Sequence, residues 1–173
     1  MDFLFETTYD QKSMTVMARV LRKTVRKKHS RFTHIFGWFM VAFCIGMMFF
    51  AEGGFSLSSQ TVITLLAVIA ITVTLIFEDQ LNGYTGRKRL PPGVSCATTI
   101  FSEDGYHSSV DLGESNWNYD KVYQLAETED YFVFIFSQSH GQVYDKKSLK
   151  GGSLEEFKAF IEEKTGKTFV FVK

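Results

Sequence analysis

The sequence has few of the residues that carry catalysis or bind metals. It contains two cysteines and four histidines in 173 residues, and no histidine stands at a metal-ligand spacing from a Cys, Asp or Glu. No glycine pair has a phosphate-binding pattern, and no serine has the context of a nucleophile elbow. The acidic residues Glu127, Glu129 and Asp130 are typical of a solvated turn. We therefore expect no enzymatic activity, no cofactor and no metal.

The scarcity of cysteine excludes a disulfide framework. Cys44 lies inside an apolar run, and Cys96 lies at the start of the polar C-terminal part of the chain. Unpaired cysteines in such different surroundings fit a reducing compartment.

Charge is missing from two long stretches. Residues 35–51 and 53–77 contain no charged residue, and only Glu52 separates them; the strongly apolar part of the second stretch is 61–77. A helix needs about 17–25 residues to cross a hydrocarbon core roughly 30 Å thick. The sequence therefore predicts a transmembrane hairpin with spans at about 35–51 and 59–77. Because the spans hold no ionisable residue, a transporter or channel in a single copy is disfavoured.

Two other interpretations of the apolar runs are weaker. A cleaved signal peptide is disfavoured because 34 residues precede the first run and no small-residue cleavage site follows it. A soluble core is disfavoured because a chain of this length leaves too little protein to cover both runs.

The net charge of zero conceals an asymmetry. Residues 1–34 hold eight Lys or Arg against three Asp or Glu, a net charge of +5, whereas residues 94–173 carry a net charge of −5. Basic residues crowd before the first span and recur at 87–89 after the second, while the predicted loop between the spans holds only Glu52. This bias predicts a multi-pass protein of the inner membrane with both flanks in the cytoplasm.

Residues 1–34 are expected to hold a short strand at 2–7 and an amphipathic helix at about 13–30. The apolar positions Met14, Met17, Leu21 and Val25 recur at helical spacing. One interpretation is that the basic side chains bind anionic lipid of the bilayer; the other is that they only set topology while the apolar stripe packs on the cytosolic domain. The candidate lipid contacts are Arg19, Arg22, Lys23, Arg26, Lys27, Lys28 and Arg31.

Residues 78–93 are expected to be a linker because Asn82-Gly83, Gly86 and Pro91-Pro92-Gly93 are turn or breaker signals. A second domain is then expected at 94–173. Its short alternating segments predict an α+β domain of antiparallel strands with a closing amphipathic helix. The expected strands are 95–101, 106–110, 115–119, 122–126, 131–136, 142–145 and 168–172. Ser153 and Glu156 form a capping-box pattern for the helix, and Gly166 stands where it ends.

An ordered set of short motifs supports a family resemblance. The motifs are TIFSEDG at 99–105, WNYDKV at 117–122, ETEDYFVF at 127–134, DKKSL at 145–149 and LEEF at 154–157. With two preceding spans, this pattern resembles the YcxB-like family of bacterial membrane proteins. The resemblance covers 94–173 and, more loosely, the basic arm and hairpin. It implies a pleckstrin-homology-like (PH-like) fold, a strongly bent sheet capped by a helix, and it brings no known enzymatic activity with it. One departure is Tyr144-Asp145-Lys146, where the family often has an Ile-Pro-Lys-like step.

These observations favour a non-enzymatic membrane protein that displays a small cytosolic module for protein interaction or regulation. Its expected partners are the lipid bilayer and another protein, a second copy or its own basic arm, and neither nucleic acid nor a small-molecule substrate is expected. Two alternatives remain: immunity or stress protection against a membrane-active peptide or toxin, and anionic-lipid sensing. Trp117 is expected either to line a ligand groove or, more commonly for such a residue, to pack in the core.

Overall fold

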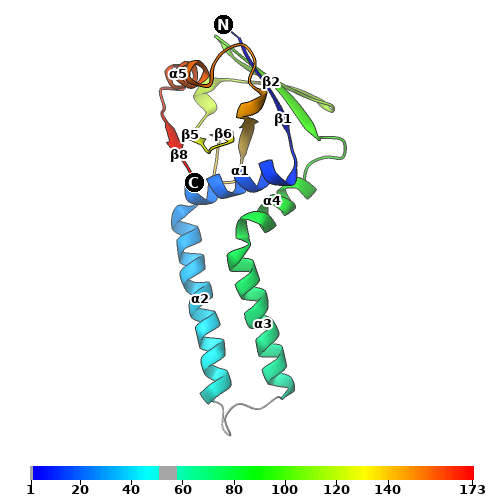
Figure 1. The fold of residues 1–173 in the computed structure, drawn as a ribbon, viewed down its shortest axis with the longest axis vertical. Coiled ribbons are helices and arrows are strands. Elements are labelled where there is room, and N and C mark those ends of the chain that lie inside the picture. Colours follow the sequence, from blue (N-terminus) through cyan, green and yellow to red (C-terminus); the bar gives the residue numbers. More distant parts are fainter. Residues whose placement is uncertain (1, 51–57) are drawn as a thin grey trace.

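A computed structural model of the protein describes residues 2–50 and 58–173. The predicted loop around Glu52 lies outside the described residues. The β-sheets form one domain, and two long helices of opposite chain direction extend from it side by side (Figure 1). A shorter helix crosses the molecule between the two parts. The elements that precede the hairpin belong to the same domain as the elements that follow it.

The hairpin consists of α2 (Lys27–Phe50) and α3 (Ser59–Ile76). Both helices are long and apolar enough to cross a membrane, and only 6% of the most apolar part of each is buried. Helix α2 begins eight residues before the predicted span, whereas α3 matches its prediction closely. The helices approach at Gly37, where an added Cβ would lie 2.8 Å from the side chain of Leu75.

Two shorter helices lie beside each other where the hairpin meets the domain. They are α1 (Gln11–Lys23) and α4 (Glu78–Lys88). Helix α4 corrects the predicted linker at 78–93. Its acidic first turn and basic last turn suit the helix dipole, and its glycines permit close packing: a Cβ on Gly83 would lie 2.7 Å from the backbone of Thr15 in α1.

The domain contains two four-stranded sheets, with the orders β1-β2-β3-β4 and β7-β6-β5-β8. The strands are β1 (Phe3–Thr8), β2 (Cys96–Ser102), β3 (Gly105–Val110), β4 (Gly113–Trp117), β5 (Gln124–Glu127), β6 (Tyr131–Ile135), β7 (Gly141–Asp145) and β8 (Phe169–Phe171). The expected α+β class is confirmed. The expectation of purely antiparallel strands is wrong for β8, which pairs parallel to β5 because α5 (Leu154–Thr165) returns the chain before β8 starts.

The main core is aromatic and lies between the sheets and α5. Phe5 from β1 and Phe101 from β2 pack on Phe157 of α5, with ring centroids 4.7 and 5.0 Å from it. The predicted capping box of Ser153 is formed, and Gly166 ends α5 in the left-handed conformation with φ 64°. Trp117 packs against the edge of this core, which is the commoner of its two expected roles.

A second apolar cluster joins α1 to the second sheet. Val20 and Leu21 of α1 are buried against a group from β5, β6, β7 and the C-terminal end. Helix α1 therefore packs against the side of the domain that faces the hairpin, and it also leads into α2.

Candidate functional site at the neck

We call α1, the first two turns of α2 (27–34) and α4 the neck. The neck is held by two acidic residues that open α4. Arg22 Nε and Nη2 donate to the two carboxylate oxygens of Asp79 at 2.6 and 2.7 Å, and Arg19 Nε lies 3.5 Å from the same carboxylate. Asp79 is only 8% exposed. This bidentate geometry is the strong form of an ion pair.

Glu78 ties the neck to α2. His34 Nε2 lies 2.7 Å from Glu78 Oε2, and Arg22 Nε lies 3.6 Å from it. The hydrogen bonds that Arg22 donates to Asp79, followed by the charges of Asp79 and Glu78, raise the pKa of Arg22 against the effect of partial burial. The charged guanidinium therefore clamps together the two helices that leave the hairpin.

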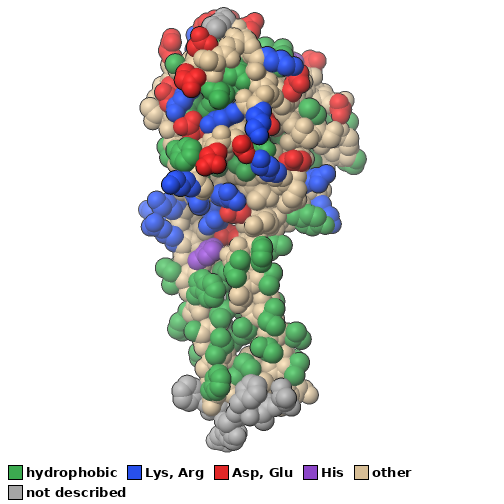
Figure 2. Space-filling model, viewed as in Figure 1, with side chains coloured by type: hydrophobic (Ala, Val, Ile, Leu, Met, Phe, Trp, Pro, Cys, Tyr) green, Lys and Arg blue, Asp and Glu red, His purple; other side chains and the backbone are tan. Residues whose placement is uncertain are grey.

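The structure separates the seven predicted lipid contacts into two groups. Arg19 and Arg22 bind Asp79, Lys23 Nζ donates to the carbonyl oxygen of Lys173, and Arg26 Nε donates to that of Gln138. The other three are exposed, and within the described part of the chain their side chains form no ion pair. They are Lys27, Lys28 and Arg31. Figure 2 shows Lys and Arg side chains gathered at the neck, between the apolar hairpin and the domain.

The apolar stripe of the predicted amphipathic helix is occupied by the protein itself. Leu21 is 3% exposed and Met14 is 4% exposed. The apolar stripe is thus packed within the protein, and only the polar side of α1 and the corner with α2 remain available to a ligand.

Sequence reasoning missed the role of Glu78 and Asp79. Both fall within the segment 78–93 that the sequence predicts to be a linker. The available signal was a pair of acidic residues directly after an apolar run, facing a basic flank before the other run. Asp79 is 57 residues from Arg22 in the sequence, so no local pattern could pair them.

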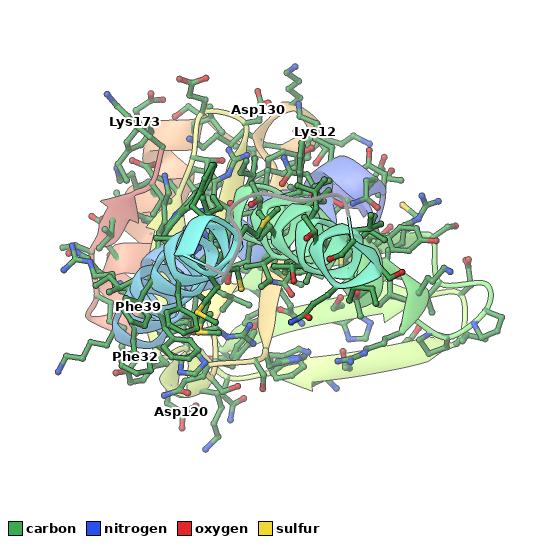
Figure 3. The ribbon with its side chains drawn as sticks, turned by 90° about the horizontal axis from the view of Figure 1, so that it is seen from below. Lys12, Phe32, Phe39, Asp120, Asp130 and Lys173 are labelled. Atoms are coloured by element: carbon green, nitrogen blue, oxygen red, sulfur yellow. The ribbon has the colours of Figure 1, made fainter. Side chains whose placement is uncertain are left out.

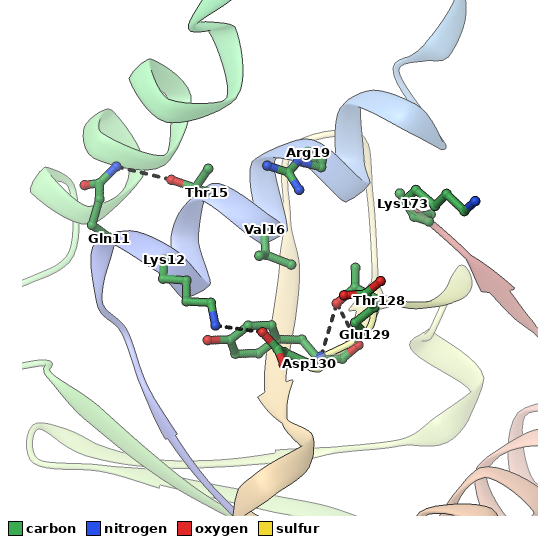
Figure 4. A pocket seen from close by; sticks show the side chains of 11 residues that line it. Gln11, Lys12, Thr15, Val16, Arg19, Thr128, Glu129, Asp130 and Lys173 are labelled. Atoms are coloured by element: carbon green, nitrogen blue, oxygen red, sulfur yellow. Dashed lines mark hydrogen bonds and ion pairs between the residues drawn. The ribbon is translucent and has the colours of Figure 1, made fainter.

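A cavity of about 760 Å³, lined by charged residues of both signs, lies between α1 and the turn from β5 to β6 (Figure 4); we call it the α1 cavity. Lys12 Nζ bonds Asp130 Oδ2 at 2.7 Å across it, and Glu129 and Lys173 lie at its rim. The Lys12 hydrogen bond and charge lower the pKa of Asp130. This is where the basic arm meets the acidic domain, so part of the expected attraction between them is satisfied within one chain.

A basic corner lies where α1 turns into α2. A cavity of about 460 Å³ is lined there by the segment 24–29 together with Tyr123, Gln124 and Gln138. A neighbouring cavity of about 340 Å³ shares Val25, Tyr123 and Gln138. Tyr123 is 65% exposed. The corner combines unpaired cations with an exposed amphipathic ring.

The histidines are accounted for by ordinary contacts. His107 Nδ1 lies 2.8 Å from Asn116 Oδ1, and the ring of His140 stacks on Trp117 at 6.0 Å. Among the residues that the structure describes, no group of three or more His, Cys, Asp or Glu side chains is placed to hold a metal ion.

Comparison with protein families gives one match. The family model described as YcxB-like protein matches residues 101–161, from the end of β2 to α5. The chain carries a YcxB-like family domain. The predicted resemblance is thereby confirmed for this part of the chain. No curated protein and no solved structure matches the chain. Strand β1 and helix α1, which precede the hairpin in the sequence, complete the YcxB-like domain, which follows the hairpin.

Proposed function

We propose that this chain is a two-span inner-membrane protein that holds its YcxB-like domain against the cytosolic face as a non-enzymatic interaction module. One observation carries the topology. Strand β1 precedes both spans and β2 follows them, yet they pair antiparallel over six residues, from Phe3 with Phe101 to Thr8 with Cys96. Paired strands must lie on one side of a membrane, so two crossings fit and a single crossing does not.

The exposed apolar surface of the hairpin supports the proposal that lipid surrounds it. Large apolar side chains on both helices face outward, among them Ile35 at 72% and Ile63 at 67% exposure. A core helix of a soluble domain would bury such residues, because each buried side chain of this size stabilises a fold by about 1.5–3 kcal/mol. A contiguous apolar surface of this kind needs lipid or another apolar partner to cover it.

The contacts within the neck support a rigid attachment of the domain to the hairpin. Helix α1 is buried in the domain through Val20 and Leu21 and is clamped to α4 by Asp79. A flexible tether would let the domain explore the cytoplasm, whereas this arrangement keeps one face toward the membrane. We further propose that the domain is PH-like, which is supported by its two four-stranded sheets with a helix near the C-terminal end.

Thiol labelling in intact cells tests the topology. In a Cys44→Ser background, the exposed Cys96 is the only remaining thiol, and we expect a membrane-impermeant maleimide to label it only after lysis. In a Cys44→Ser/Ser58→Cys variant, we expect labelling before lysis at residue 58. Labelling of Cys96 in intact cells, or of Ser58→Cys only from the cytoplasm, would overturn the orientation.

In-membrane photo-crosslinking tests the interaction role. A crosslinking residue at Leu112, which is 61% exposed in the turn between β3 and β4, should give a discrete protein adduct or a homo-oligomer. The same residue at Phe39, which is 62% exposed on α2, serves as the control because it faces the lipid. A protein that stays monomeric and free of adducts at Leu112 and other exposed domain positions would contradict the proposal.

A further inference from the structure

The basic corner differs from the α1 cavity, whose lining mixes Lys and Arg with Glu129 and Asp130. The described residues that line the 460 Å³ cavity include Arg26, Lys27, Lys28 and His29 and no Asp or Glu. Asp120 lies on the same side of the molecule (Figure 3), but it pairs with Lys121 at 3.3 Å and is not part of the lining. The corner therefore presents uncompensated positive charge inside a concave surface, which suits an anionic group.

The corner also lies at a defined depth. On α2, the apolar run begins directly after His34, and on α3 it ends directly before Glu78; these two side chains bond each other. This pair marks the edge of the apolar zone. Arg31 stands about 4.5 Å from His34 along the helix, within a headgroup layer about 5–7 Å thick. Lys28 stands about 9 Å from His34, at the outer edge of that layer, where a long lysine side chain can meet the lipid phosphates.

An apolar groove runs along the hairpin from this corner. It has a volume of about 380 Å³ and is lined by Phe36, Gly37 and Met40 of α2 and by Ala70 and Leu75 of α3. Thr33, at its upper end, bonds the carbonyl oxygen of His29 through Oγ1 at 3.1 Å. One face of α2 thus passes from the cation-lined cavity at His29 to the apolar groove at Thr33 within a single turn.

The outward face of α2 that carries Phe32 and Phe39 lies on the other side of the molecule from the α1 cavity. Seen from the hairpin end, Phe32 and Phe39 lie on one side of the molecule, and Lys12, Asp130 and Lys173 lie on the other (Figure 3). The ring of Phe32 stacks on that of Phe36, which lines the groove, with centroids 6.4 Å apart. Glu78 is the carboxylate nearest to this path, and it is bound by His34 at 2.7 Å.

We propose that the corner and the groove together bind one anionic phospholipid of the leaflet that faces the domain. Arg26, Lys27, Lys28 and Tyr123 surround its phosphate, and one acyl chain lies in the groove beside Gly37. The cavity volume falls in the range of about 300–1,000 Å³ that is usual for ligand sites. This inference rests on the proposed membrane topology, since it places the corner at headgroup depth.

Native mass spectrometry of the full chain in mild detergent tests the site independently of topology. The probes are a phosphatidylglycerol and a phosphatidylcholine with identical acyl chains. We expect preferential retention of the anionic lipid. A Lys27→Gln/Lys28→Gln variant should bind it about 30-fold more weakly, from about 1 kcal/mol for each cation and tenfold for each 1.4 kcal/mol. The control, Lys147→Gln/Lys167→Gln, removes the same charge from the domain away from the corner.

Two matched alanine-to-phenylalanine substitutions on α3 test the groove. Ala70→Phe fills the groove and should lower retention at unchanged charge, whereas Ala67→Phe adds the same ring one turn away, outside the lining, and should not. Equal losses in the two lysine pairs would overturn the headgroup site in favour of diffuse attraction. Equal effects of the two phenylalanines would overturn the acyl groove. Displacement of the lipid by millimolar inorganic phosphate would overturn the lipid as occupant.

Discussion

The Arg22–Asp79 clamp gives the sharpest test of how the domain is mounted. Asp79→Asn keeps the shape of the side chain and removes its charge. Arg22 then loses its nearer counter-ion, with Glu78 remaining at 3.6 Å, and keeps at most one of two hydrogen bonds, at 2.6 and 2.7 Å. Because α1 both packs against the domain and leads into α2, we expect the loss to lower the stability of the whole chain.

The magnitude follows from the burial of the two groups. Removing one partner of a fully buried pair costs about 3–5 kcal/mol, and a hydrogen bond to a charged group contributes about 1.5–3 kcal/mol. The side chains of Arg22 and Asp79 are 24% and 11% exposed, so water replaces part of the lost interaction. We expect a destabilisation of about 2–3 kcal/mol, which for a chain of this size is about 4–12 °C in melting temperature.

The assay is thermal unfolding of the full chain in mild detergent, followed by size-exclusion recovery. Asp130→Asn is the matched control, because it removes the same charge from the exposed Lys12–Asp130 pair, where the side chains are 59% and 38% exposed. Solvent screens such pairs, so we expect little shift. A double-mutant cycle with Arg22→Gln should show coupling, since the double variant leaves no buried charge unpaired.

Two results would refute this reasoning. The first is an equal melting shift for Asp79→Asn and Asp130→Asn, which would make the clamp an ordinary surface pair. The second is an additive double variant with Arg22→Gln, which would mean that the two residues act through separate contacts.

Three further predictions use the same assay. Gly83→Ala should lower the free energy of unfolding by about 1–3 kcal/mol through overpacking, since the added Cβ would lie 2.7 Å from the α1 backbone. The control Gly46→Ala, whose added Cβ would have no atom within 4 Å, should be neutral. Equal melting shifts for the two variants would exclude close packing of α4 on α1. Phe5→Ala should cost about 3–5 kcal/mol because the ring is fully buried, and a shift of a degree or less would show that β1 is dispensable. The pKa of Asp130 is lowered by Lys12, so this pair stabilises the fold above the ordinary carboxyl pKa of about 4 and its contribution is lost as pH falls through the lowered value. The melting difference between Lys12→Met and wild type should therefore vanish in acid; a difference that grows there would contradict the sign.

Local signals in the sequence were sufficient for most elements. The capping box joins Ser153 and Glu156, three positions apart, and Gly166 N–H donates to the carbonyl oxygen of Glu162, four positions before it, so the sequence alone predicts α5. The same holds for the uncharged run that becomes α3. In each case the residues that decide the structure are neighbours in the chain.

The features that the sequence did not predict are those set by contacts between residues far apart in the chain. Gly83 and Gly86 look like turn residues at 78–93, yet they are small because α1 packs against them. Tertiary packing overrides a helix propensity penalty of about 1 kcal/mol for each glycine. The direction of β8 depends on where α5 sends the chain, and the partner of Asp79 lies in a helix on the other side of the hairpin. None of these has a local signature.

The clamp and the sheet pairing together make the hairpin an insertion within the domain. Phe3 and Phe5 belong to the aromatic core, and Leu4 is held on its other side by two backbone hydrogen bonds to Lys150, both at 2.9 Å. These partners follow α3 in the sequence, so β1 has no sheet to join until both helices of the hairpin have been synthesised. Contacts of such long sequence separation form late, because loop closure must precede them. The fold therefore makes completion of the YcxB-like domain conditional on a correctly formed hairpin. In the topology that we propose, a misinserted second helix would leave β1 and β2 on opposite sides of the membrane, and Phe5 could not reach the core residues that follow the hairpin.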